Sequence, residues 1–257
     1  MNNQENLRFC FIIPCYRHAR SLKDLLIKLS EYKIPAVVVD DGNTAEDRAL
    51  IDLTVEEVNP AIKVKVLHHD VNCGKGYAVA TAVDYAAQNG YTHVIQMDSD
   101  GQHNTHDVPL IINLVKENTE SVISGAPLYD ASAPRARVIG RKITNFFVHV
   151  ETLSNEITDA MIGFRAYPAK ITDKIIKKYN IRSRMNFDIE ILVRLKWAGT
   201  HIRFFNTRVS YPEGGMSNFR GIDNLKISLM HTKLCTLMIL SLPYRLLKMI
   251  GRLFNGK

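Results

Sequence analysis

Short apolar runs alternate with segments of helical period along the first two-thirds of the chain. Residues 9–13 are continuously apolar, as in a buried strand, and leucines then recur at the spacing of a helix that Ser21 opens. They are Leu22, Leu25, Leu26 and Leu29. Further strands are expected at residues 36–39, 64–67, 93–97 and 121–124, with a helix from about residue 77 to residue 90. Strands separated by helices of this length predict an α/β fold, with a mostly parallel sheet and helices on both faces.

Small polar clusters follow the early strands, at residues 14–16, 40–42, 72–76 and 98–100. In open α/β sheets, ligands bind outside the carboxyl ends of the strands. Four clusters on that edge therefore predict one composite site, to which we expect Pro14, Tyr16, Asp41 and Lys75 to contribute.

Asp98 and Asp100 stand two residues apart at the end of a predicted strand, so in extended backbone their side chains point the same way. That geometry lets two carboxylates share one hard divalent cation, and Gln102 continues the alternation with a third oxygen. A solvated loop is the competing interpretation, because Asp-x-Asp is common in loops. An EF-hand calcium loop is excluded, since it needs Gly in place of His103 and Glu in place of Pro109.

The segment Gly74-Lys75-Gly76 has glycines that let backbone amides approach a phosphate at a helix N-terminus. It is not a Walker loop, because Gly76 stands where that loop needs Ser or Thr. It is not a dinucleotide fingerprint either, because Val79 replaces the third glycine. Close helix packing is the alternative to a phosphate contact by Lys75.

Asp40 and Asp41 follow an apolar strand, where a carboxylate suits hydrogen bonding to a ribose or to a base edge. The alternative is a turn formed by the Asp-Gly pair at residues 41–42.

The composition is that of an ordinary globular protein with a basic tail. A hydrophobic fraction of 46% and a charged fraction of 23% indicate neither a disordered nor a fibrous chain. The net charge is +7, and residues 225–257 hold six Lys or Arg and no Asp or Glu. We therefore expect a globular domain at residues 1–220 and a basic tail at residues 221–257. Four cysteines without C-x-x-C spacing, and a polar N-terminus without an apolar signal core, favour the cytoplasm.

Several motifs occur in the order and spacing found in family 2 glycosyltransferases with the GT-A fold. They are Ile13-Pro14-Cys15-Tyr16, Val39-Asp40-Asp41-Gly42-Asn43, Asn72-Cys73-Gly74-Lys75-Gly76 and Met97-Asp98-Ser99-Asp100-Gly101-Gln102-His103. The likeness continues through Asp159, Gly163-Phe164-Arg165-Ala166-Tyr167, Phe187-Asp188-Ile189-Glu190 and Gly214-Gly215-Met216-Ser217. Within that family the sequence most resembles the dolichyl- and polyprenyl-phosphate sugar synthases.

This resemblance implies a GT-A sheet and an inverting enzyme that moves a hexosyl or N-acetylhexosaminyl group from a nucleotide sugar to a lipid acceptor. It implies that Asp40 and Asp41 contact the nucleoside. It also implies that Asp98, Asp100 and Gln102 hold Mg²⁺ or Mn²⁺ against the diphosphate.

Arg137 and Arg141 stand where the synthases have basic residues that face phosphate. The family pattern Arg-x-x-x-Ser becomes Arg137-x-x-x-Arg141 in this chain, which changes the expected contact with the acceptor phosphate.

The choice of acceptor decides whether a general base is needed. A lipid phosphate is already anionic, whereas a hydroxyl must lose its proton to a carboxylate, for which Asp159, Asp188 and Glu190 are the candidates. Asp188 and Glu190 open a predicted helix that Gly199 closes. Because they stand two positions apart, we expect only one of them to face the site. Charge at a helix N-terminus is their alternative role.

Two other functions use a similar binding face. A nucleotidyltransferase generally has a Gly-rich phosphate loop after its first strand, where this chain has Pro-Cys-Tyr-Arg-His at residues 14–18. A non-catalytic, membrane-bound sensor of nucleotide sugars would bind without turnover. A nucleic-acid binder is disfavoured, because the positive charge lies in an apolar tail and no interleaving of aromatic and basic residues occurs in the body of the chain.

The tail is expected to form amphipathic helices that bind the surface of an anionic membrane without crossing it. Its longest uncharged stretch, residues 234–242, ends at Pro243, whereas a span needs about 20 apolar residues. After Pro243 apolar residues recur at helical spacing, at Leu246, Leu247, Ile250, Leu253 and Phe254, with basic residues between them. The alternative is that this stripe packs on the protein itself or on a second subunit.

Overall fold

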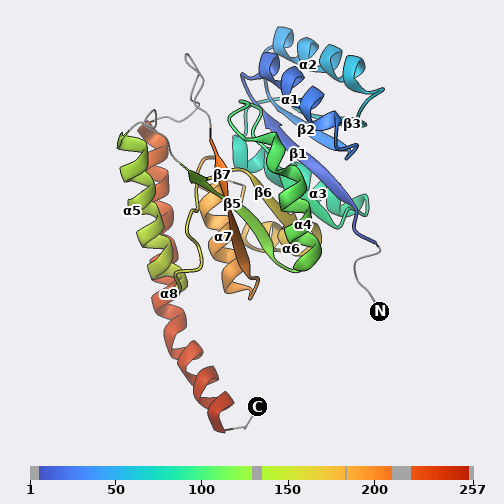
Figure 1. The fold of residues 1–257 in the computed structure, drawn as a ribbon. Helices are drawn as coiled ribbons and strands as arrows, with labels where there is room; N and C mark the ends of the chain where they lie inside the picture. Colours follow the sequence, from blue (N-terminus) through green and yellow to red (C-terminus); the bar gives the residue numbers. More distant parts are fainter. Residues whose placement is uncertain (1–5, 129–134, 183, 210–220, 255–257) are drawn as a thin grey trace.

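The computed structural model describes residues 6–128, 135–182, 184–209 and 221–254. The side chains of residues 136, 137 and 244–254 are not described. The described residues contain one seven-stranded sheet (Figure 1). The first half of the chain alternates strand and helix: β1 (Phe9–Cys15), α1 (Ala19–Ser30), β2 (Ala36–Asp41), α2 (Ala45–Val58), β3 (Val64–His69), α3 (Lys75–Gln88) and β4 (His93–Gln96). β1 pairs in parallel with β2 and with β4, and β2 pairs in parallel with β3. These are the crossover units that the sequence predicts.

The second half of the chain completes the sheet. Its elements are the 3₁₀ turn η1 (Thr105–Asp107), α4 (Val108–Glu117), β5 (Val122–Leu128), α5 (Arg135–Thr152), β6 (Arg165–Pro168), α6 (Ala169–Tyr179), α7 (Phe187–Trp197), β7 (Ile202–Arg208) and α8 (Gly221–Phe254). The strand order is β3-β2-β1-β4-β6-β5-β7. Only β6 runs antiparallel to its neighbours β4 and β5 among the described strands. The predicted α/β fold with a mostly parallel sheet is confirmed.

Two apolar cores lie on opposite faces of the sheet because side chains alternate along each strand. In β1, Cys10 and Ile12 pack with helices α3, α6 and α7. Phe11 and Ile13 pack on the other face, with helices α1, α2 and α4. Both faces are therefore covered, and strands that are buried on both sides read as continuous apolar runs in the sequence.

Helices α5 and α8 pack side by side at one edge of the molecule (Figure 1). His231 of α8 lies 2.7 Å from the carboxylate of Glu151 of α5, and both are buried. Leu234 is fully buried in the same layer. Pro243 lies inside α8, so the tail is one continuous helix whose first half packs on the domain.

Candidate active site

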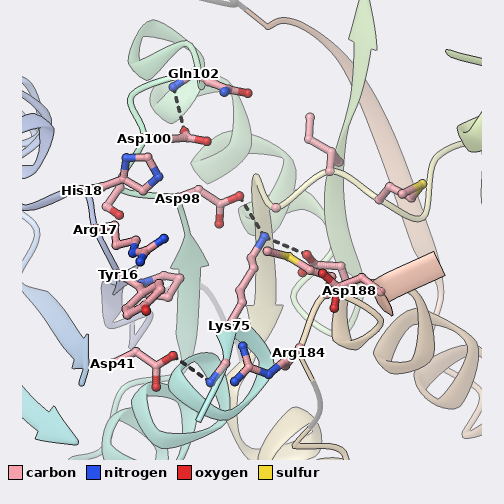
Figure 2. Close-up of a pocket in the computed structure, with 18 of the residues that line it drawn as sticks. Tyr16, Arg17, His18, Asp41, Lys75, Asp98, Asp100, Gln102, Arg184 and Asp188 are labelled. Atoms are coloured by element: carbon pink, nitrogen blue, oxygen red, sulfur yellow. Dashed lines mark hydrogen bonds and ion pairs between the residues drawn. The ribbon is translucent and has the colours of Figure 1, made fainter. Parts of the chain in front are cut away.

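A cavity of about 610 Å³ opens at the carboxyl ends of β1, β2 and β4 (Figure 2). Residues after those strands form one wall, and residues of α5, α7 and α8 form the facing wall. Of the candidates from the sequence, the lining includes Pro14, Tyr16, Asp41, Lys75, Asp98, Asp100, Gln102, Arg141 and Asp188. The composite site expected from the strand ends therefore exists as a single hollow.

Asp41 ends β2 at the cavity and holds the loop before α3. Its carboxylate accepts hydrogen bonds from the backbone N–H of Cys73 at 3.0 Å and of Gly74 at 2.8 Å, and from the side chain of Asn72 at 2.8 Å. His69 contacts the same carboxylate at 2.9 Å. Gly74 has a φ of +98°, which favours glycine, so the loop can bring its amides onto Asp41. Asp41 thereby fixes the start of α3 beside Lys75.

Asp40 lies away from this cavity, contrary to the role that the resemblance implies for it. β2 extends through both aspartates, so consecutive side chains point to opposite faces of the sheet. The carboxylate of Asp40 is fully buried and binds Arg48 at 2.8 Å, His68 at 2.8 Å and Asn43 at 2.7 Å. Burial opposes its ionisation, but these partners hold the pKa of Asp40 below its usual value.

Lys75 bridges two carboxylates across the cavity. Its Nζ lies 2.8 Å from Asp98 Oδ2 and 2.7 Å from Asp188 Oδ2, as Figure 2 shows. Burial disfavours the ammonium, but Asp188 and Asp98 outweigh it and raise the pKa of Lys75 above its usual value. The bridge ties the strand-end wall to the N-terminus of α7.

Asp98 and Asp100 form the acidic corner of the cavity, although not through the extended backbone that the spacing suggests. β4 ends at Gln96, and the chain turns at residues 99–101. Asp98 Oδ1 is buried and has no hydrogen-bond partner among the described residues. Asp100 accepts a hydrogen bond from the backbone N–H of Gln102 at 3.0 Å. An unsatisfied carboxylate oxygen beside a second carboxylate fits a hard divalent cation such as Mg²⁺ or Mn²⁺.

His103 adds a nitrogen to the same corner. Its Nε2 lies 3.6 Å from Asp98 Oδ2, and its ring stacks on Phe164 at 5.6 Å between centroids. Neither ring nitrogen has a hydrogen-bond partner among the described residues. Burial opposes the charge of Asp98, but Lys75 and His103 hold the pKa of Asp98 well below its usual range. Asp98 is therefore ionised at neutral pH.

Gly163 forms the floor between these groups. A Cβ atom at this position would lie 2.6 Å from Asp98 Oδ2 and 2.8 Å from Lys75 Nζ. No side chain fits there without displacing the ion pair, which gives a steric reason for the glycine.

Arg141 of α5 reaches the cavity from the opposite side. It binds both oxygens of Asp159, at 2.8 and 2.6 Å. Asp159 also accepts hydrogen bonds from the backbone N–H of Ile162 at 2.8 Å and of Met161 at 3.0 Å. Asp159 thus orients Arg141 and the loop before Gly163, and it is not among the residues that line the cavity.

The two carboxylates at the start of α7 face different hollows. Asp188 lines the cavity, accepts a hydrogen bond from Gln96 at 3.2 Å and binds Lys75. Glu190 points away and pairs with Arg194 at 3.2 Å and Lys233 at 3.5 Å. Only one of the pair faces the site, as their spacing on a helix predicts.

The sequence reasoning assigned no role to His103, Gly163 or Arg184, which also line the cavity. Gly163 belongs to one of the family motifs, but the closeness of Asp98 and Lys75 to its Cα can be seen only in the three-dimensional structure. The side chain of Arg137 and residues 214–217 lie outside the described part of the chain.

The family model for glycosyl transferase family 2 matches residues 10–176 of the chain. The polyprenol monophosphomannose synthase of Mycolicibacterium smegmatis is 27% identical over 175 residues, which are 65% of this chain and 64% of that protein. The UDP-N-acetylglucosamine–dolichyl-phosphate N-acetylglucosaminyltransferase of Methanococcus voltae is 22% identical over 219 residues, which are 80% of this chain and 87% of that protein. The chain thus spans less than two-thirds of the length of the Mycolicibacterium synthase.

The fold also resembles solved structures. Glucosyl-3-phosphoglycerate synthase from Mycobacterium tuberculosis, crystallised with Mn²⁺, UDP and glucosyl-3-phosphoglycerate, superposes with a TM-score of 0.63. The two chains are 12% identical, and the match covers 93% of this chain and 80% of that one. At this identity the likeness shows the fold, which is of the GT-A type.

Proposed function

This chain belongs to glycosyl transferase family 2, and we propose that it moves a sugar from a nucleotide-diphosphate donor to a lipid phosphate, with inversion at the sugar carbon. One observation carries the proposal: Asp41, Lys75 and the acidic corner at Asp98 line a single cavity. The relatives that act on dolichyl or polyprenol phosphates support the class of acceptor. The names of these relatives include both a hexosyl and an N-acetylhexosaminyl transfer.

In this proposal Asp41 faces the nucleoside end of the donor. Its carboxylate already accepts hydrogen bonds from residues 72–74 and contacts His69, so it would act by holding that loop in place at the edge of the donor cavity. Lys75, at the start of α3, contributes positive charge and a helix N-terminus, both of which suit a diphosphate.

Asp98 and Asp100, with Gln102 beside them, would hold Mg²⁺ or Mn²⁺. A divalent metal supplies positive charge that stabilises the leaving diphosphate. Lys75 keeps Asp98 ionised and oriented, and Gly163 leaves the room that this arrangement needs.

The acceptor phosphate would bind near Arg141, on the wall opposite the strand ends. A phosphate is already anionic at neutral pH, so its transfer needs positioning and in-line approach without a general base. If the acceptor were a hydroxyl, Asp188 would be the base, because Asp159 and Glu190 are engaged elsewhere. Transfer to phosphate is favoured because Asp188 is already paired with Lys75.

We also propose that the enzyme works on the cytoplasmic face of a membrane, bound to its surface through α5 and α8. Apolar side chains on both helices are exposed: Ile139, Ile143 and Phe146 on α5, and Leu225, Leu229, Ile239 and Leu240 on α8. The segment Gly221–Pro243 is long and apolar enough to cross a membrane, and 28% of the most apolar stretch within it is buried against the rest of the protein. Surface binding is favoured because Asp223 and Ile227 line the cavity. Between Ile227 and Arg245 there are 17 residues, 228–244, and they include Lys233, whereas a span needs about 20 apolar residues.

The proposal is tested by incubating the full chain with a panel of nucleotide sugars, a divalent metal and a membrane lipid extract, followed by mass spectrometry of the lipids. A glycosylated lipid phosphate together with free nucleoside diphosphate is expected. Release of pyrophosphate would indicate a nucleotidyltransferase. Donor binding without any product would indicate a sensor.

A further inference from the structure

A second hollow, of about 530 Å³, lies beside the donor cavity, where the residues before α7 meet α8. Its polar lining includes Arg182, Arg184, Asn186, Glu190, Lys226 and Lys233. Arg184 also lines the donor cavity and is the residue shared by both linings among those described. The first half of α8 therefore contributes to two separate hollows.

The charge in this hollow is strongly positive. Four of its lining side chains are cationic, namely Arg182, Arg184, Lys226 and Lys233, and Glu190 is the one carboxylate among the described lining residues. Glu190 pairs with Arg194 at 3.2 Å, which is outside the lining, and with Lys233 of the hollow at 3.5 Å. The hollow thus presents more positive charge than its own acidic residue balances.

The N-terminus of α7 opens toward the same place. Asn186 is the N-cap residue, but its side chain makes no capping hydrogen bond. The side chain is 9% exposed, and its Oδ1 has no hydrogen-bond partner among the described residues. Asn186 lines the hollow, so the N–H₂ group of its amide can donate to a ligand there. An unpartnered buried amide, a helix N-terminus and four cations all suit an anion with several oxygens.

We propose that this second hollow binds a phosphate group, independently of the transfer reaction in the donor cavity. Arg184 links the two sites: its backbone oxygen accepts a hydrogen bond from Gly76 at 3.2 Å, and its guanidinium donates to the backbone oxygen of Asn72 at 3.4 Å. An anion held by Arg184 therefore fixes the loop at residues 72–74, which binds the Asp41 carboxylate and leads into Lys75. Leu229 and Met230 give the hollow an apolar wall on α8, which fits the phosphate of a membrane phospholipid whose chains continue along that helix.

Cys73 provides a local reporter, because it lines the second hollow and not the donor cavity. The alkylation rate of Cys73 is measured by peptide mass spectrometry on the full chain, with added glutathione as the standard for the reactivity of the reagent. Inorganic phosphate is compared with chloride at equal ionic strength, and phosphatidylglycerol vesicles are compared with phosphatidylcholine vesicles. When the ligand concentration is ten times its dissociation constant, occupancy of the hollow is expected to lower the alkylation rate of Cys73 by about tenfold.

Two variants remove equal charge at exposed positions. Arg182→Ala with Lys226→Ala changes the hollow, and Lys170→Ala with Lys174→Ala changes α6 only. The first pair is expected to lose the protection of Cys73, and the second pair is expected to keep it. Protection by inorganic phosphate alone supports the site with a soluble phosphate as its ligand, and protection by phosphatidylglycerol as well supports a lipid headgroup.

The proposal is overturned if neither phosphate nor phosphatidylglycerol slows the reaction of Cys73 in the unaltered chain. It is also overturned if the protection survives in the Arg182→Ala, Lys226→Ala chain, because phosphate would then act through the donor cavity. Neither readout requires sugar transfer, so this test stands or falls separately from the proposed function.

Discussion

Replacing Gly163 with alanine tests the geometry of the acidic corner directly. The added methyl group would lie 2.6 Å from Asp98 Oδ2, whereas an ordinary contact is at least 3.4 Å, so the groups must separate by about 0.8 Å. A displacement of about 1 Å in a reacting arrangement costs about 10²-fold in rate. We therefore expect Gly163→Ala to lower kcat/KM by about 10²-fold, or about 2.7 kcal/mol of transition-state stabilisation.

The assay is steady-state transfer at several Mn²⁺ concentrations, with thermal unfolding measured in parallel. The melting temperature should change little, because the displaced atoms are the ends of the Asp98 and Lys75 side chains in a cavity. Gly221→Ala is the matched control, since a Cβ there meets nothing within 4 Å. If Gly163→Ala retains turnover and Mn²⁺ dependence within about threefold of the unaltered chain, the argument from crowding is wrong.

Four further changes probe the site and the tail. Asp98→Asn should abolish transfer while thermal unfolding stays cooperative, and EDTA should do the same to the unaltered chain; activity insensitive to both would exclude the metal assignment. Asp188→Asn should cost less than about tenfold in kcat, since a lipid phosphate needs no base, whereas a loss of about 10²–10⁴-fold would indicate a hydroxyl acceptor. Because its folded-state pKa is lowered, Asp40 stabilises the protein above its unfolded pKa and loses this effect as pH falls through the folded value. Asp40→Asn should therefore cost about 2 kcal/mol in urea unfolding at neutral pH and much less in acid; an equal cost at both would refute this account. A chain that ends at Pro243 should bind anionic liposomes more weakly by about 1 kcal/mol per basic residue removed, and equal sedimentation of both chains would argue against a role for the tail.

Hydropathy and strand-end polarity were sufficient to predict β1 to β5 and the edge that bears the cavity, but not β6 or β7. The sequence pattern placed both Asp40 and Asp41 after β2. Because the strand includes both, the alternation of side chains separates them, and only Asp41 borders the cavity. For Asp98 and Asp100 the assumed strand is a turn, yet both side chains line the same hollow.

Other features depend on contacts between distant segments, which local patterns do not encode. The antiparallel strand β6 is only four residues long, and its pairing with β4 is set by the whole sheet. The ion pair of Lys75 with Asp188 joins residues more than a hundred positions apart. The tail was expected to form more than one amphipathic helix, but α8 continues through Pro243 as one helix.

The strand order also dictates when the cavity can form while the chain is being synthesised. β1 to β4 are neighbours in space, so they can pair once Gln96 has emerged from the ribosome. The free edge of β4 then waits for β6, which begins at Arg165; these 69 residues (165 minus 96) take roughly 3–14 seconds to translate. During that interval an unpaired edge is open to aggregation or to chaperones. A nascent chain that stops before α7 carries Asp41 and Asp98 without Asp188, the carboxylate that faces Asp98 across Lys75.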